Sequence, residues 1–203
     1  MKDPKHFYSA VRRAFGPITR SLAGGGITPN MLTVTGIVLN LIAGALIVLG
    51  YLYWAAGVFI VASFCDMLDG SVARWAGKES AFGAFLDSTV DRIAEGITLT
   101  ALGLYFYRSG HPYELTAVFV FLVSSFLVSY TRARAEALGL ECTVGLMSRP
   151  ERIIALSAGL ILHRWHVLSV VVFAVAFLTS FTVLQRILYV RRHLRRPPEA
   201  PSS

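Results

Sequence analysis

The chain has 203 residues, of which 55% are hydrophobic and only 15% are charged, and its mean hydropathy is +0.60. Soluble domains carry about 25% charged residues, so this composition excludes an ordinary soluble protein and predicts an integral membrane protein. A net charge of +7 would suggest a nucleic-acid partner for a soluble chain. Here we expect no nucleic acid, because the basic residues mark one side of a membrane.

Residues 1–28 predict an amphipathic helix that lies on the membrane surface, followed by a linker. Apolar side chains recur at helical spacing over 7–22, and Arg12, Arg13 and Arg20 lie between them. An apolar stripe with basic flanks is typical of an interfacial helix rather than of a transmembrane one. The stretch "GGGITPN" then ends the helix.

An all-α core of six transmembrane helices is predicted at 29–190. Residues 31–65 carry no charge, and a single helix of that length would measure about 52 Å, more than the ~30 Å hydrocarbon core of a bilayer. They therefore predict two spans with a turn near 50–54, and the second span continues to about Trp75. The remaining spans are expected at about 82–107, at about 113–137, from just after Pro150 to 163–166, and at about 167–190.

The basic residues predict the orientation in the membrane. Six spans place both termini on one side, and every lysine and arginine except Arg108 and Arg164 falls on that side. By the positive-inside rule, both termini are expected in the cytoplasm and the protein in the plasma membrane. The basic end at 191–203 is predicted to be disordered, and 1–203 is predicted to form a single domain.

Four aspartates lie where the second and third spans should be apolar. Asp66 and Asp69 are three residues apart, and Asp87 and Asp91 are four apart, so each pair shares a helix face. A short loop makes the two helices antiparallel neighbours, which allows the faces to converge. Four carboxylates at one membrane level need cations, and oxygen ligands suit Mg²⁺, Mn²⁺ or Ca²⁺. The pattern predicts a site for two ions about 3.5–4 Å apart.

Two other interpretations of the aspartates remain open. Intramembrane salt bridges could involve Arg74 and Arg92, but two arginines neutralise at most two of the four carboxylates. A polytopic cation transporter would also need acidic residues in the membrane, although no acidic residue of the other spans obviously continues a path. Glu95, one turn beyond Asp91, is expected to support the site or the helix packing.

The stretch from Asp66 to Asp91 reads Asp66-x2-Asp69-Gly70-x2-Ala73-Arg74-x8-Gly83-x3-Asp87-x3-Asp91. This resembles the complete signature of the CDP-alcohol phosphotransferases, and the six-span layout resembles that family along nearly the whole chain. The resemblance implies transfer of a phosphatidyl group from CDP-diacylglycerol to an alcohol, with release of CMP. It further implies that the four aspartates bind two Mg²⁺ ions, with Mn²⁺ as an alternative, and that Asp91 is the catalytic general base.

The same resemblance assigns residues to the CDP-lipid. Gly70, Ala73 and Arg74 belong to the motif. Ser80, and the "PNML" stretch that opens the first span, occupy positions that resemble nucleotide contacts, although Pro-Asn is equally typical of a helix start. The expected CDP-lipid contacts are Pro29, Asn30, Met31, Leu32, Asp66, Asp69, Gly70, Ala73, Arg74 and Ser80.

Arginines at the cytoplasmic ends of the last three spans indicate an anionic acceptor, because guanidinium groups bind phosphate through paired hydrogen bonds. The arrangement resembles the phosphatidylinositol phosphate synthase branch, whose acceptor is inositol 1-phosphate. Phosphatidylglycerophosphate synthesis and the archaetidylinositol phosphate counterpart, which acts on ether-linked lipid, are alternatives. The family resemblance also implies a homodimer. The predicted acceptor-binding residues are Ser129, Arg132, Arg134, Arg149, Arg152 and Arg186.

Overall fold

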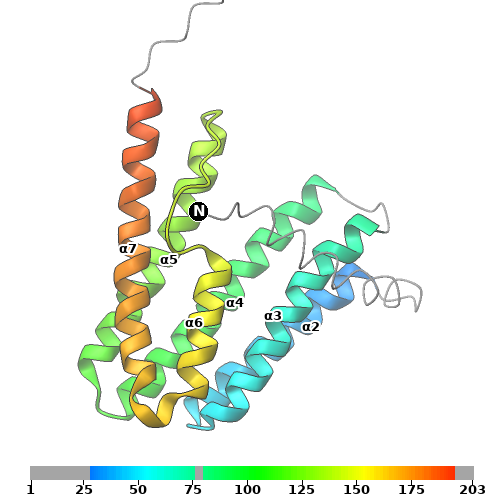
Figure 1. Cartoon of the computed structure of the whole chain (residues 1–203). Helices are drawn as coiled ribbons and strands as arrows, with labels where there is room; N and C mark the ends of the chain where they lie inside the picture. The colour runs from blue at the N-terminus through cyan, green and yellow to red at the C-terminus, as the bar shows by residue number, and fades with distance from the viewer. Residues whose placement is uncertain (1–27, 76–79, 195–203) are drawn as a thin grey trace, which may run out of the picture.

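The computed structural model describes residues 28–75 and 80–194, without the side chains of Pro29 and 73–75, and over these residues it contains helices and no strands. The predicted surface helix, the loop at 76–79, the residues from 195 onward and the side chains of Ala73 and Arg74 lie outside the described part. The helices are α2 (Pro29–Val48), α3 (Leu52–Trp75), α4 (Ala81–Arg108), α5 (Pro112–Ala137), α6 (Arg149–Ile161), the 3-10 turn η1 (His163–Trp165) and α7 (Val167–Leu194) (Figure 1).

Side-chain caps set where two of the helices begin. The Thr28 hydroxyl accepts a hydrogen bond from the Met31 backbone N–H at 3.3 Å, and Pro29 follows at the first helical position of α2. Ser80 caps α4 in the same way, by accepting from the Gly83 N–H at 3.0 Å. These fixed starts decide which side chains of α2 and α4 face the neighbouring helices.

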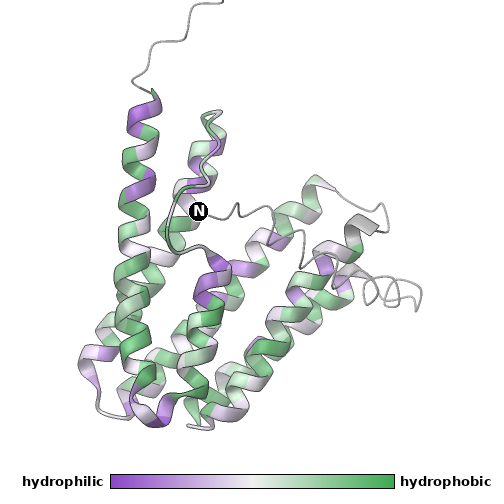
Figure 2. Cartoon of the chain, viewed as in Figure 1, coloured by the Kyte–Doolittle hydropathy of each residue, from purple (hydrophilic) through white to green (hydrophobic). Residues whose placement is uncertain are grey.

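Four of the described helices are long and apolar enough to cross a membrane. Large apolar side chains stay exposed on their outer faces, for example Val38 and Leu41 on α2 and Phe177 on α7. Figure 2 shows hydrophobic residues along the bundle, with hydrophilic residues mostly toward its ends. An apolar outer surface of this extent suits lipid rather than water, so the chain is a membrane protein. The four stretches are Asn30–Val48, Leu52–Val72, Pro112–Ala137 and Val167–Leu194.

The two remaining α-helices, α4 and α6, are less suited to cross a membrane by composition or by length. The N-terminal part of α4, up to Glu95, carries the charged residues Asp87, Asp91, Arg92 and Glu95. α6 has only 13 residues, about 20 Å at 1.5 Å per residue, which is shorter than the ~30 Å hydrocarbon core. By length and composition, the described helices therefore support four of the six predicted spans.

Two predicted boundaries differ from the structure. The fifth predicted span begins at Arg149 rather than after Pro150, because proline is accepted in the first turn of a helix. α7 continues to Leu194 instead of ending at 190, so the first residues of the predicted disordered tail are helical. The ring of His193 stacks on Tyr189 one turn earlier, at 4.0 Å between centroids, and extends the helix.

Buried polar side chains join the helices inside the bundle. Thr98 of α4 donates to Asn40 Oδ1 of α2 at 3.3 Å, and the hydroxyls of Ser124 on α5 and Thr179 on α7 lie 2.5 Å apart. In a membrane, such hydrogen bonds contribute to helix association because lipid tails are as apolar as leucine. α2 packs against α3 and α4, α5 against α4 and α7, and α6 against α3 and α7.

The connection at 138–148, between α5 and α6, lies against α7. Three α7 side chains hydrogen-bond to its backbone at 2.9–3.1 Å: Thr182 to Met147, Arg186 to Val144 and Tyr189 to Glu141. Gly145 has a φ of +137°, and a Cβ at this position would collide with Thr182. The connection is therefore packed, and it determines where α6 starts.

Candidate metal and active site

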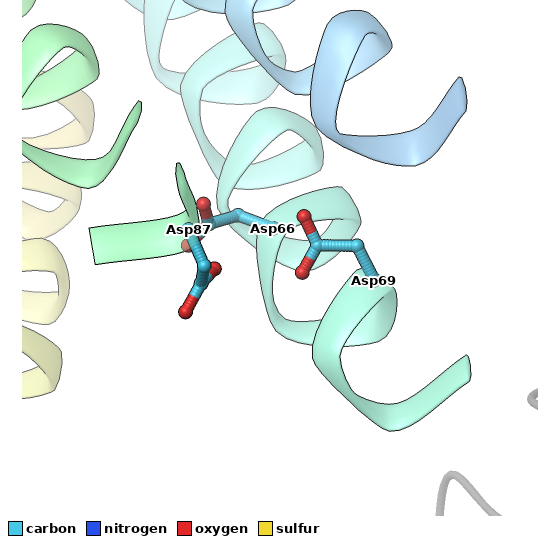
Figure 3. A group of neighbouring side chains, drawn as sticks. All are labelled: Asp66, Asp69 and Asp87. Carbon is cyan, nitrogen blue, oxygen red and sulfur yellow. The ribbon is translucent and has the colours of Figure 1, made fainter. Parts of the chain in front are cut away.

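Three aspartates from two helices converge at one end of the bundle. Asp66 and Asp69 lie on α3 and Asp87 lies on α4, and one carboxylate oxygen of each is within 4.8 Å of the other two (Figure 3). The i, i+3 spacing places the first pair on one face of α3, and α4, which packs against α2 as α3 does, brings Asp87 to that face. The predicted convergence of the two helix faces is confirmed for these three residues.

A threonine of α2 orients Asp69. The Thr33 hydroxyl donates to Asp69 Oδ2 at 2.7 Å, and the Gly70 backbone N–H donates to Oδ1 at 2.6 Å. Asp69 is buried, whereas Asp87 is exposed. One side of the cluster is therefore fixed by hydrogen bonds, and the other side, at Asp87, is exposed.

The fourth aspartate faces an arginine. Asp91 is buried, its Oδ1 lies 2.7 Å from Arg149 Nη1, and its Oδ2 lies 3.2 Å from Arg92 Nη1. The first contact is an ion pair without hydrogen-bond alignment, since no described donor is aligned with Oδ1. The same Nη1 of Arg149 lies 2.6 Å from Asp66 Oδ2. Arg149 therefore bridges Asp66 and Asp91, and Asp66 also belongs to the candidate ion site with Asp69 and Asp87.

Arg152 pairs with the glutamate that follows Asp91 by one helical turn. Its Nε lies 2.8 Å from Glu95 Oε1 and its Nη2 lies 3.4 Å from Oε2, and the Arg152 side chain is only 3% exposed. This paired geometry is the strong form of an arginine–carboxylate contact. Glu95 thus joins α4 to α6 through this ion pair.

The remaining predicted acceptor residues have different surroundings. Arg186 is buried and donates to the carbonyl oxygens of Val144, at 2.9 Å, and of Val128. Arg132 and Arg152 are near enough to act electrostatically on Arg186. Arg132 also pairs with Glu136 at 2.8 Å on the exposed side of α5, Arg134 is exposed, and Ser129 is half-buried.

Comparison with known proteins decides the family. Residues 26–182 match the family model described as CDP-alcohol phosphatidyltransferase. This chain belongs to the CDP-alcohol phosphatidyltransferase family. It is 37% identical to an archaetidylinositol phosphate synthase of Methanothermobacter thermautotrophicus over 93% of this chain and 94% of that one. It is also 37% identical to a phosphatidylinositol phosphate synthase of Streptomyces avermitilis, over 93% and 82%.

Solved structures of another CDP-alcohol phosphatidyltransferase share the fold. The crystal structure of Mycobacterium tuberculosis phosphatidylinositol phosphate synthase with CDP-DAG bound has a TM-score of 0.80 and 33% identity, and covers 88% of this chain and 94% of that chain. The same enzyme in complex with manganese and citrate has a TM-score of 0.79 and 32% identity, over 92% and 91%. The present chain is therefore a transferase of this family.

Some of the residues predicted to contact the CDP-lipid form the starts of helices in this phosphatidyltransferase. Pro29 and Asn30 begin α2, which confirms the helix-start interpretation of "PNML"; Met31 is exposed and Leu32 is buried. Ser80 caps α4. Their contacts with nucleotide stay a prediction, as do those of Gly70, Ala73 and Arg74.

Three features of the site were not predicted from the sequence. They are the bond from Thr33 to Asp69, the bridge from Arg149 to Asp66 and the pair between Arg152 and Glu95, whose partners are 36, 83 and 57 residues apart. Helical spacing indicates only neighbours three or four residues away. No local signal therefore identifies these contacts.

Proposed function

We propose that this chain transfers the phosphatidyl group of CDP-diacylglycerol to inositol 1-phosphate and releases phosphatidylinositol phosphate and CMP. The observation that carries the proposal is the convergence of Asp66, Asp69 and Asp87 at the end of a membrane bundle of this family. The printed names of several relatives, which are phosphatidylinositol phosphate or archaetidylinositol phosphate synthases, support the choice of acceptor.

The proposed cofactor is a pair of Mg²⁺ ions, with Mn²⁺ as a substitute. The cluster offers only carboxylate oxygens, from two helices, within 4.8 Å of one another, and hard divalent cations prefer such ligands. Asp66, Asp69 and Asp87 would hold one ion, and Asp66 with Asp91 would hold the second. When bound, the ions would neutralise the diphosphate of the CDP-lipid and stabilise its leaving group.

Asp91 is the proposed general base. The acceptor hydroxyl gives its proton to Asp91, and its oxygen forms a bond to the phosphorus that carries the diacylglycerol. The bond between this phosphorus and the oxygen of CMP breaks, and CMP leaves with the bonding electrons. The buried position of Asp91 beside Asp66 supports this role, since a base must lie within reach of the proton that it accepts.

The substrates are proposed to bind on either side of the aspartates. The start of α2, the motif residues of α3 and Ser80 contact the CDP-lipid: Pro29, Asn30, Met31, Leu32, Asp66, Asp69, Gly70, Ala73, Arg74 and Ser80. The closeness of Arg132 and Arg152 to Arg186 supports an anionic acceptor, because these three arginines outnumber the two glutamates, Glu136 and Glu95, that pair with them, and an excess of positive charge favours a ligand of opposite charge. The proposed acceptor contacts are Ser129, Arg132, Arg134, Arg149, Arg152 and Arg186.

We also propose a six-span layout within one domain, in a plasma-membrane homodimer. Figure 1 shows the successive helices running alternately up and down, so α4 and α6 return the chain across the bundle. The charged N-terminal part of α4 then lies at the cytoplasmic surface, where water and substrates reach it. Residues 1–28 would lie on that surface, and both termini would be cytoplasmic, as the basic residues favour.

The proposal is tested with purified protein, CDP-diacylglycerol and Mg²⁺. Inositol 1-phosphate, inositol, glycerol 3-phosphate and serine are supplied in turn, and CMP release is followed. We expect release with inositol 1-phosphate and little with free inositol. Release with glycerol 3-phosphate alone would favour phosphatidylglycerophosphate synthesis. No CMP with any of these acceptors would refute the proposed acceptor and mean that this transferase uses another alcohol or another CDP-linked donor.

One observation favours testing a second lipid donor. The archaeal and bacterial relatives are equally similar to this chain, at 37% identity each. The same assay with an ether-linked CDP-archaeol in place of CDP-diacylglycerol separates the two. Faster turnover of the ether lipid would make this chain the archaetidylinositol phosphate counterpart.

A further inference from the structure

Arg149 and a second divalent ion require the same carboxylates. Nη1 of Arg149 lies 2.6 Å from Asp66 Oδ2 and 2.7 Å from Asp91 Oδ1. A Mg²⁺ ion bound by Asp66 and Asp91 would occupy the space between those oxygens, since Mg²⁺ binds its oxygen ligands at about 2.0–2.1 Å. A guanidinium nitrogen at its present distances and the ion cannot be present together, because they would overlap and repel each other.

The three-aspartate cluster meets this conflict at one of its members, Asp66, whose Oδ2 contacts Arg149. Asp69 is held by Thr33 and Gly70, and Asp87 is exposed. Neither forms one of the ion pairs of Arg149, which are to Asp66 and Asp91. A first ion can therefore bind to Asp66, Asp69 and Asp87 while Arg149 stays in contact with Asp91.

We propose that Arg149 is a positioning residue that holds Asp66 and Asp91 until a second divalent ion displaces it, so that the two ions bind in order. This inference rests on the proposed two-ion function. Guanidinium stays protonated under all ordinary conditions, so Arg149 leaves the carboxylates only by moving. The second ion therefore binds more weakly than the first, by the cost of breaking these partly buried contacts.

Manganese binding without substrate tests the order. Free Mn²⁺ is measured by electron paramagnetic resonance during titration of the purified protein in detergent. The parent is expected to bind one ion tightly and a second more weakly. Arg149→Gln should bind the second ion at least about tenfold more tightly, because two charge-assisted contacts no longer compete, and should bind the first ion nearly as before.

Arg92→Gln is the matched control. It removes the same charge beside the same Asp91, but among the described carboxylates Arg92 pairs with Asp91 alone, at 3.2 Å, and its Nη1 also donates to the Ser88 carbonyl oxygen. A nearby charge alone therefore predicts equal effects of the two substitutions, whereas displacement predicts a clearly larger effect of Arg149→Gln. Arg149→Lys keeps the charge with a single ammonium group, and should shift the second affinity in the same direction by a smaller factor.

Thermal unfolding supplies a second measurement. Here the Arg149→Gln substitution should be unfavourable, whereas it should strengthen binding of the second ion. With a chelator, Arg149→Gln should melt below the parent because its carboxylates repel each other without a cation; with excess Mn²⁺ the difference should disappear. An unchanged second affinity, equal effects of Arg149→Gln and Arg92→Gln, or the same melting deficit in both conditions would overturn the inference. If neither parent nor variants bind Mn²⁺, the proposed metal site itself is wrong, and the inference with it.

Discussion

Asp66 is the carboxylate on which both halves of the site depend. It belongs to the cluster with Asp69 and Asp87, and it shares Arg149 with Asp91. A carboxylate has two oxygens and accepts several contacts, so one side chain serves two neighbouring positions. The roles proposed for the aspartates can be separated because each one has different partners.

Replacement of Asp87 by asparagine should lower turnover at least about a hundredfold. Mutation of a residue that merely hydrogen-bonds to a metal ligand already lowers metal affinity or activity ~10–100-fold, and Asp87 is proposed to bind the metal directly. Asp87 is exposed, so the variant should fold normally. CMP release and gel-filtration profiles measure the two properties. Glu114→Gln makes the same chemical change in the first turn of α5 and should leave turnover near that of the parent. Normal Mg²⁺-dependent activity of Asp87→Asn would refute the assignment.

Asp91→Asn should lower turnover by about 10²–10⁴-fold, the usual contribution of a general base, while CDP-lipid binding largely survives. Lipid binding is measured by equilibrium titration, and turnover by CMP release. If both fall together, Asp91 acts mainly as an ion ligand. Unchanged turnover would place the base elsewhere.

Arg186→Ala should raise the apparent Michaelis constant for inositol 1-phosphate about tenfold to a hundredfold, because a hydrogen bond to a charged group contributes ~1.5–3 kcal/mol. The constant for CDP-diacylglycerol should change much less. Arg191→Ala removes an exposed charge further along α7 and serves as the control. A change confined to the CDP-lipid constant would assign Arg186 to the donor side.

At the scale of the elements, the pair between Glu95 and Arg152 fixes α6 against α4. Both side chains are largely buried, at 14% and 3% exposure, so each needs the other as its counter-charge. α6 is short and meets few neighbours besides α3 and α7. This ion pair therefore has a large share in placing Arg149 beside the aspartates.

Glu95→Gln should destabilise the protein by roughly 3–5 kcal/mol, the usual result of leaving a buried charge without its partner. Unfolding by sodium dodecyl sulphate in mixed micelles measures the change. The control is Glu136→Gln, which breaks the exposed pair with Arg132 and should cost at most about 1 kcal/mol. The double variant Glu95→Gln, Arg152→Met should recover stability. Equal stability of Glu95→Gln and Glu136→Gln would mean that the buried ion pair between Glu95 and Arg152 does not hold α6 in place.

At the scale of the whole molecule, the bundle separates a polar end from an apolar body. The aspartates lie in the later part of α3 and the early part of α4, and the short turns after α2 and α4 lie at the opposite end of these two helices (Figure 1). A lipid-linked donor and a water-soluble acceptor can meet only where the membrane ends. This placement agrees with the proposed reaction at the cytoplasmic surface.

Single cysteines should report this orientation. In a chain with Cys65→Ala and Cys142→Ala, Ser109→Cys lies after α4 and Thr143→Cys lies in the connection before α6, and both positions are exposed. A membrane-impermeant maleimide applied to intact cells should label the first cysteine only, and should label the second after lysis. The reverse pattern would invert the proposed topology.

The sequence by itself determined the membrane class, the helix positions to within a few residues and the convergence of three aspartates. Hydropathy, capping residues and helical spacing are local properties, and they act before any long-range contact forms. The tertiary structure alone decided that Arg149 lies with Asp66 and Asp91, that Arg152 pairs with Glu95, and that Arg186 supports the connection to α6. A long arginine side chain reaches several partners, and the helix packing selects among them.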